Sequence, residues 1–264
     1  MNEIEQLTKL AKEMRKTVLE TSFNCGEPSH IGGALSIVDI MAVLYDNILN
    51  INLKNPMDRF ILSKGHGFLG LLSALHSQGY ISKKKLMTFQ KNGSEFIAHP
   101  IENQRYGIES SNGSLGQGLS FGIGIALSYK KKLRKELVYV LVGDGECYEG
   151  SIWEAAISAT ELELGNLTVI VDCNGHQNDG LIGKKMNYEN LKNKWHGFGW
   201  NTILCDGHNI AELLNVLKIK TENKPTAIIA KTIKGKGVNF MENNNDWHHG
   251  RLTKNLFDDA LKSL

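Results

Sequence analysis

The sequence predicts an α/β fold, a doubly wound parallel sheet with helices on both faces. Two apolar runs, residues 137–142 and 167–171, do not alternate with polar residues, which is typical of strands buried on both faces. Between them, residues 151–159 have the spacing of a small-residue helix, so the whole stretch indicates a buried parallel βαβ unit. A chain of 264 residues can bury one large core, and we expect a single domain over residues 1–264.

The remaining elements follow from the same spacing rules. Apolar residues at helical intervals predict an N-terminal helix within residues 1–25, a C-terminal helix over 251–264, and helices over 36–49, 69–78 and 119–129. A polar helix is expected shortly before Ile97. Short apolar runs predict a strand over 59–63 and two further buried strands over 202–205 and 226–230.

Composition excludes several classes of function. The formal net charge of +2 is too small to predict nucleic-acid binding, and the lysine runs at 83–85 and 130–132 are expected on solvated helix faces. The 4 cysteines have no Cys-x-x-Cys spacing, which fits a reducing compartment and favours neither a disulfide framework nor a zinc site. The N-terminus is amphipathic and no apolar run reaches the length of a membrane span, so we expect a cytoplasmic protein.

Two polar residues directly follow the predicted strands of the βαβ unit. Asp144 lies between Gly143 and Gly145 after the first strand, and Asn174 follows the second. Ligands of open parallel sheets bind beyond the carboxyl ends of the strands, so both side chains should face one crevice. A carboxylate, an amide oxygen and a turn carbonyl suit a hard cation, with the remaining ligands coming from water or a bound phosphate. A tight turn with an incidental acid is the alternative, and Asn174 argues against it.

These residues resemble a known family. Gly143-Asp-Gly145 followed by Asn174 is similar to the thiamine diphosphate fingerprint, and residues 146–152 resemble the version found in transketolases. The resemblance covers nearly the whole chain and implies the diphosphate-binding domain of the thiamine diphosphate-binding fold. It implies that Asp144, Asn174 and the main-chain carbonyl of His176 hold Mg²⁺, or Ca²⁺ or Mn²⁺, against the cofactor diphosphate. Gly143, Gly145 and Glu146 are then cofactor-binding residues.

Four histidines match histidines of the family's active site. The resemblance implies that His30, in the segment Ser29-His-Ile-Gly-Gly33, contacts substrate and that His66 lies beside the cofactor diphosphate. It places His99 near the reactive ring of the cofactor and the hydroxyls of the donor sugar. His248, in Trp247-His-His249, is assigned a role facing cofactor and substrate, although the doubled histidine leaves the register open by one. Imidazoles titrate near neutrality and suit proton transfer and hydrogen bonding to hydroxyls.

A glycine-rich loop, residues 112–118, runs into the helix over 119–129. Backbone amides at such a helix start can bind phosphate or allow close packing on a cofactor ring, and helix–helix packing is the plainer interpretation. In transketolases the similar loop lines the cofactor site, which implies that Gly113, Leu115 and Gly116 are contacts.

The pattern also differs from full-length transketolases. The glutamate that acts on the cofactor's aminopyrimidine belongs to a second, pyrimidine-binding domain of the family, and nothing in this sequence matches that domain. The resemblance therefore implies the N-terminal subunit of a split enzyme, whose partner in an α2β2 heterotetramer is a separate C-terminal transketolase subunit. Glu149 is similar to a family glutamate that reaches across the subunit contact. The implied reaction transfers a two-carbon ketol unit from a ketose to an aldose, and whether these sugars are phosphorylated stays open.

Other functions fit parts of the sequence. A deoxyxylulose phosphate synthase, the α chain of a 2-oxo acid dehydrogenase and a non-catalytic cofactor-binding module would share the fingerprint. A nucleotide-binding doubly wound domain would need a Gly-x-Gly-x-x-Gly turn after its first strand, and none is there. A zinc site of His176 with His208 lacks thiols and paired spacing. The turn at 231–237 lacks the Walker spacing, so we do not expect a phosphate loop there.

Overall fold

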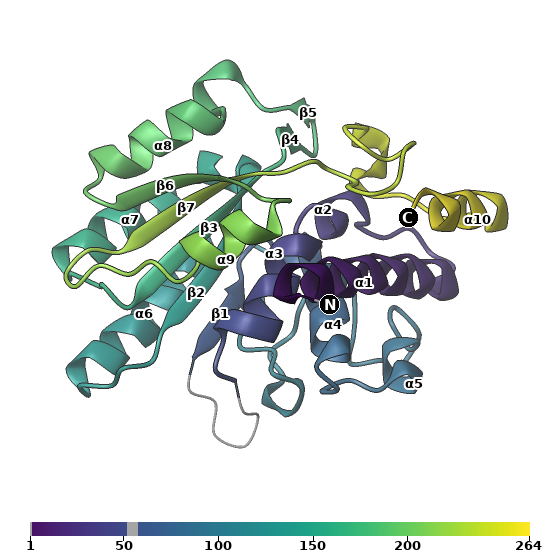
Figure 1. The fold of residues 1–264 in the computed structure, drawn as a ribbon, viewed down its shortest axis with the longest axis horizontal. Helices are drawn as coiled ribbons and strands as arrows, with labels where there is room; N and C mark the ends of the chain where they lie inside the picture. The colour runs from purple at the N-terminus through teal and green to yellow at the C-terminus, as the bar shows by residue number, and fades with distance from the viewer. Residues whose placement is uncertain (1, 52–57) are drawn as a thin grey trace.

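The computed structural model describes residues 2–51 and 58–264. Its centre is a five-stranded sheet with all neighbours parallel and the order β1-β2-β3-β7-β6 (Figure 1). The strands are β1 (Arg59–Leu62), β2 (Val138–Gly143), β3 (Leu167–Cys173), β6 (Asn201–Asp206) and β7 (Thr226–Lys231). The predicted α/β fold with a parallel sheet is therefore confirmed.

Helices cover both faces of the sheet (Figure 1). One face packs against α1 (Glu3–Cys25), α3 (Val38–Val43), α4 (Phe68–Ser77) and α9 (Ile210–Val216). The other face packs against α6 (Gln117–Lys131), α7 (Gly150–Glu161) and α8 (Tyr188–Gly197). Successive strand residues point to opposite faces, so Tyr139 joins the first core and Val140 the second. This two-sided burial explains why the strands have continuous apolar runs.

The helix expected over residues 36–49 is divided in the structure. It consists of α2 (Gly32–Leu35), α3 and a π-helical turn at Leu44–Ile48, all but the last residues being buried. Such turns locally widen a helix and shift its side chains. Close packing shapes the entry to this segment, because a Cβ on Gly32 would lie 2.7 Å from the carbonyl oxygen of Trp247.

The other helix predictions agree to within a few residues. The polar helix before Ile97 is a single turn, α5 (Lys83–Leu86), with Ser82 as its N-cap. The C-terminal helix is α10 (Lys254–Ser263), which begins after the capping residue Thr253 and packs against α1 (Figure 1). Short elements complete the described chain: 3₁₀ turns at Gly65–Gly67, Gln104–Tyr106, Gly145–Tyr148, Lys184–Met186 and Asn245–His248, and the hairpin β4 (His176–Gln177) and β5 (Gly180–Leu181).

The strand over 202–205 was expected to be buried, and this expectation is wrong. The strand, β6, lies at the edge of the sheet and pairs only with β7, so most of its side chains are half-buried. A strand with a neighbour on one side only has less of its surface covered. The second strand of that prediction, β7, lies inside the sheet and is buried except at Lys231.

All 4 cysteines are buried, and none of them is in a disulfide. Within residues 2–51 and 58–264, no helix is both long enough and apolar enough to cross a lipid bilayer.

Candidate active site

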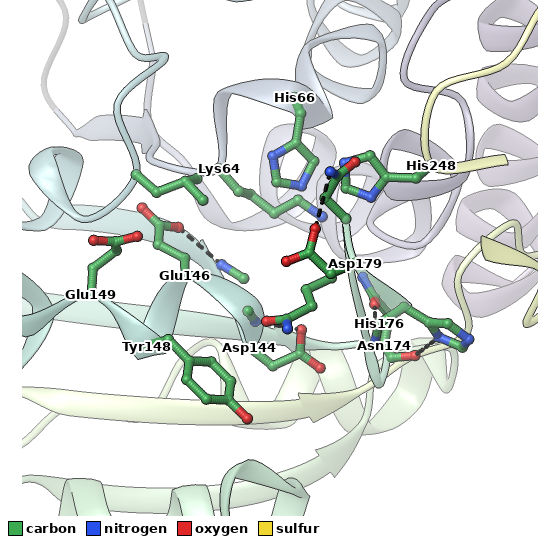
Figure 2. Close-up of a pocket in the computed structure, with 15 residues that line it drawn as sticks. Lys64, His66, Asp144, Glu146, Tyr148, Glu149, Asn174, His176, Asp179 and His248 are labelled. Atoms are coloured by element: carbon green, nitrogen blue, oxygen red, sulfur yellow. Dashed lines mark hydrogen bonds between the residues drawn. The ribbon is translucent and has the colours of Figure 1, made fainter. Parts of the chain in front are cut away.

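A pocket of about 250 Å³ opens beyond the carboxyl ends of β1, β2 and β3 (Figure 2). Asp144 and Asn174 lie on one side of it, with His66 and His248 facing them from the other. The lining residues come from segments far apart in the sequence: Lys64, His66, Leu115, Gly143, Asp144, Gly145, Glu146, Tyr148, Glu149, Asn174, His176, Gln177, Asn178, Asp179 and His248. The carboxyl edge of the sheet therefore gathers most of the residues predicted from the sequence.

Asp144 is a buried carboxylate without a cationic partner. Its oxygens accept hydrogen bonds from the backbone amides of Gly145 (2.8 Å) and Gly175 (2.7 Å), and none of the ion pairs in the described residues includes it. Burial, together with the nearby charge of Asp172, raises the pKa of Asp144 to about 7. A divalent cation at this carboxylate would supply the missing positive charge and favour the ionised form.

Asn174 and His176 adopt one tightly bonded turn after β3. The Asn174 amide donates to Asp172 (2.9 Å) and accepts from the backbone amide of His176 (3.0 Å), which fixes the direction of its oxygen. The His176 ring is paired with the main-chain oxygen of Asn174 (2.9 Å). Because a carbonyl oxygen can only accept, Nδ1 of His176 carries a proton and is not available as a metal ligand.

A zinc site finds no support in the described residues. No three His, Cys, Asp or Glu side chains of residues 2–51 and 58–264 come together as metal ligands. His208 is occupied elsewhere, since one ring nitrogen pairs with Asp39 (2.7 Å) and the other accepts from the backbone amide of Ile233 (2.8 Å). The oxygen set of Asp144, the Asn174 amide and the His176 carbonyl suits a hard cation better.

Beneath this turn lies a fully buried ion pair between Lys64 and Asp172. The Lys64 ammonium also donates to the Gly33 carbonyl (2.9 Å), and Asp172 accepts further hydrogen bonds from Ser36 (2.8 Å) and Thr232. Burial opposes the ionisation of Asp172, but Lys64 and these donors hold its pKa below its usual value. The pair joins the ends of β1, β3 and β7. The Lys64–Asp172 pair was not predicted from the sequence, because neither the residue types nor their spacing indicates that the two side chains are in contact.

Glu146 ties two site segments together. One of its oxygens accepts from the Ser63 hydroxyl (2.5 Å) and the Gly116 amide (2.8 Å), and the other accepts from the Gly143 amide (3.1 Å). The side chain is buried, and burial raises its pKa. Both carboxylate oxygens of Glu146 thus have hydrogen-bond partners in this chain, and the residue holds the segments of Ser63, Gly116 and Gly143 together at the pocket. Glu149, by contrast, is exposed at the rim.

The glycine-rich loop contributes one side chain to the pocket. Leu115 lines it, and Gly116 caps α6 with a φ of +82°. A Cβ on Gly116 would lie 2.2 Å from the Ser151 hydroxyl, so the position requires glycine for conformation and for space. Gly113 is exposed with open space around it, and the pocket lining does not include it.

Four histidine rings surround that of His30 beside the pocket. Their centroids lie 5.9 Å (His66), 5.2 Å (His99), 5.5 Å (His248) and 4.6 Å (His249) from that of His30. Burial and the neighbouring rings lower the pKa of His30 to about 3, and burial with Lys234 lowers that of His248 to about 4. Both of these rings are therefore neutral at physiological pH. The predicted set His30, His66, His99 and His248 does meet in space, and the doubled histidine adds His249 on the exposed side.

Three further features were not found from the sequence. The hairpin after Asn174 supplies Gln177, Asn178 and Asp179 to the lining, and Tyr148 lies at the rim. The turn rejected as a phosphate loop brings the buried Lys234 next to His248, at 2.9 Å. The sequence shows two consecutive Lys-Gly pairs in this turn, but it does not indicate which of the two lysines is buried.

Comparison with known proteins decides the family. The family model described as "Transketolase, thiamine diphosphate binding domain" matches residues 8–263. The chain belongs to the transketolase family. Transketolases are transferases, and the five-stranded parallel sheet with helices on both faces is their thiamine diphosphate-binding fold.

Some relatives are similar along their whole length. A subunit of the apulose-4-phosphate transketolase of Actinobacillus succinogenes is 38% identical, covering 98% of this chain and 96% of that protein. The 6-deoxy-6-sulfo-D-fructose transketolase subunit SqwG of a Clostridium species is 36% identical, covering 96% and 94%. Both relatives are named as subunits of transketolases rather than as whole enzymes.

Other transketolases are much longer than this chain. Human transketolase is 32% identical over 99% of this chain but only 42% of its own length. The crystal structure of transketolase from Campylobacter jejuni matches with a TM-score of 0.89 at 31% identity, covering 99% of this chain and 43% of that one. The chain thus spans about two fifths of these longer transketolases.

Proposed function

We propose that this chain is the N-terminal, thiamine diphosphate-binding subunit of a two-chain transketolase, which transfers a two-carbon ketol unit from a ketose to an aldose. The observation that carries the proposal is the crevice at the strand ends. There an uncompensated buried carboxylate, Asp144, faces a cluster of histidines whose pKa values are lowered. The full-length match to single subunits of other transketolases supports the division into two chains.

The residues of the pocket fit the cofactor and a divalent cation. Asp144, Asn174 and the His176 carbonyl would hold Mg²⁺, while His66, Leu115, Gly145 and His248 would contact thiamine diphosphate. Among the described residues, the carboxylate of Asp144 has no cation beside it, and the buried Nδ1 of His30 has no hydrogen-bond partner. A bound metal and cofactor could supply both. When bound, the cofactor supplies the carbanion chemistry that breaks and forms the carbon–carbon bond.

The protein's own part in the reaction is to bind, orient and move protons. Lowered pKa values keep His30, His99 and His248 neutral, and a neutral ring has one N–H donor and one acceptor nitrogen. His30 and His99 can therefore both donate to and accept from sugar hydroxyls, whereas Nδ1 of His248 already contacts the Lys234 ammonium at 2.9 Å. A neutral imidazole can take a proton from a hydroxyl and return it, which is the role that we propose for His99 and His30. The buried Lys64–Asp172 pair holds three strand ends in register behind them.

A partner subunit would complete the site. Tyr148 at the rim of the pocket has about half of its surface exposed, and so do Phe121 and Ile157 on helices α6 and α7, which begin next to pocket residues. Large exposed apolar side chains next to an open pocket favour a protein contact. We propose that the C-terminal transketolase subunit covers this face, with Glu149 at the contact, in an α2β2 assembly in the cytoplasm.

The proposed substrates are sugars with an anionic group. One relative is named for a sugar phosphate, apulose 4-phosphate, and another for a sulfonated sugar, 6-deoxy-6-sulfo-D-fructose. We propose that the partner subunit contacts the anionic end of the sugar.

The test is a ketol-transfer assay on the complex that the tagged chain retains from its own cells. Xylulose 5-phosphate and its unphosphorylated form serve as donors and ribose 5-phosphate as acceptor, with and without thiamine diphosphate and Mg²⁺. We expect transfer by the complex and none by the chain alone. In His99→Ala, turnover should fall far more than cofactor affinity. A complex that binds the cofactor but forms only decarboxylation or condensation products would contradict the proposal.

A further inference from the structure

Lys234 is a buried cation that no carboxylate pairs with in the described residues. Its side chain is 1% exposed, and its ammonium contacts two neutral groups: Oδ1 of Asn245 at 2.8 Å and Nδ1 of His248 at 2.9 Å. Burial and the nearby Lys64 lower its pKa to about 8, which still leaves it mainly protonated at pH 7. Because an ammonium can only donate, both partners must be acceptors.

This contact determines where His248 carries its proton. If Nδ1 accepts from Lys234, the proton of the neutral ring must be on Nε2. Burial and the charge of Lys234 together lower the pKa of the His248 ring to about 4. His248 is therefore a neutral ring with a defined tautomer. Its centroid lies 5.4 Å from that of His66, and both rings line the pocket (Figure 2).

Asn245 determines the position of Lys234. Since the Asn245 oxygen accepts from the ammonium, its amide nitrogen must point the other way, and it donates to the Asn178 carbonyl at 2.9 Å. Asn178 lies in the turn between β4 and β5, which lines the pocket. One amide thus joins the lysine beside His248 to the β4–β5 hairpin that lines the pocket.

We infer that Asn245 is a positioning residue, which through Lys234 fixes His248 as the Nε2–H tautomer and ties the β4–β5 hairpin to the site. The inference rests on the proposed function, because it takes His248 as a residue that faces cofactor and substrate. Asn245 itself is outside the pocket lining.

Two substitutions separate the amide's two contacts. Asn245→Asp keeps an oxygen for Lys234 and loses the donor to Asn178, whereas Asn245→Ala loses both contacts. Asn193→Asp makes the same chemical change on the exposed face of α8 and serves as the control. The test uses the two-chain complex with only this chain labelled with ¹⁵N-histidine, and His248→Gln identifies the His248 signals in ¹H–¹⁵N correlation spectra.

We expect the Nε2–H pattern for His248 in the wild type, Asn193→Asp and Asn245→Asp, and a mixture of tautomers in Asn245→Ala. Turnover of Asn245→Ala should fall about 10-fold, as for other supporting hydrogen bonds, with cofactor affinity little changed. A His248 proton on Nδ1 in the wild type, or an unaltered tautomer or turnover in Asn245→Ala, would overturn the inference. If the wild-type complex lacks ketol transfer, the proposed function fails, but the spectra still decide the tautomer.

Discussion

The buried ionisable residues of this site differ in whether a charge of opposite sign lies beside them. Asp172 is buried with Lys64 beside it and keeps a low pKa, whereas Asp144, buried without a cation, has its pKa raised. Burial lowers the pKa values of His30 and His66, together with neighbouring rings at His30 and the charge of Lys64 at His66, which keeps these histidines neutral. A carboxylate that gains from a metal and rings that stay uncharged suit a site for a metal-bound diphosphate and for the hydroxyl groups of a sugar.

The neutrality of His30 predicts how stability depends on pH. The pKa of His30 falls from 6.5 in the unfolded chain to about 3 in the folded chain, so between these values the unfolded state binds the extra proton. As the pH falls from about 7 to 5, the wild type should lose unfolding free energy relative to His30→Asn. Urea unfolding of both proteins at each pH measures this difference. A difference that stays constant would show that the folded ring titrates normally.

Residues were predictable from the sequence where a local pattern determines their place. Asp144 and Asn174 follow buried strands, and parallel strand ends meet at one edge, so their proximity could be inferred. Lys64, Asp172 and Lys234 could not be assigned, because their roles arise from contacts between segments far apart in the chain. Gly113 fitted a family motif, but its place outside the pocket lining depends on the path of the loop.

At the scale of elements, α6 shows how small residues bring a helix close to the sheet. Gly122 lies on its buried side, where an added Cβ would be 2.4 Å from Cγ2 of Val140 on β2. Gly124 is exposed on the same helix, with open space around it. The two glycines therefore have different structural roles in one helix.

We expect opposite effects from alanine at these positions. Gly122→Ala should destabilise the protein by about 1–3 kcal/mol, because the methyl group overpacks the helix against β2. Gly124→Ala should be neutral or stabilise it by up to about 1 kcal/mol through helix propensity. Urea unfolding monitored by circular dichroism gives both values. Equal destabilisation by the two changes would contradict close packing at Gly122 as the cause.

The elements themselves were predictable to the extent that burial leaves a periodic pattern. Strands buried on both faces, such as β2 and β3, have continuous apolar runs, and the long helix α1 has a clear apolar stripe. The burial of β6 was predicted wrongly because an edge strand can be as apolar in sequence as a central one. The division into α2, α3 and the π-helical turn was not predicted, because the apolar residues of this segment continue through both breaks.

As a whole, the molecule presents an open pocket on one edge of its sheet, with the exposed apolar Tyr148 at its rim and further exposed apolar side chains on α6 and α7. The chain matches single subunits of some transketolases along their whole length and about two fifths of longer transketolases. We propose that this edge is the metal- and diphosphate-binding half of a site shared with a partner. Asp144 should then control cofactor binding through the metal.

Calorimetric titration of thiamine diphosphate into the two-chain complex examines this role of Asp144 without relying on turnover. The titration compares the wild type, Asp144→Asn and Asp179→Asn, each with Mg²⁺ and with the metal removed by chelation. Asp179 is the control, because it is an exposed carboxylate that lines the same pocket. We expect Mg²⁺-dependent binding in the wild type and Asp179→Asn, and its loss in Asp144→Asn. Undiminished binding by Asp144→Asn in Mg²⁺ would contradict the proposed metal site.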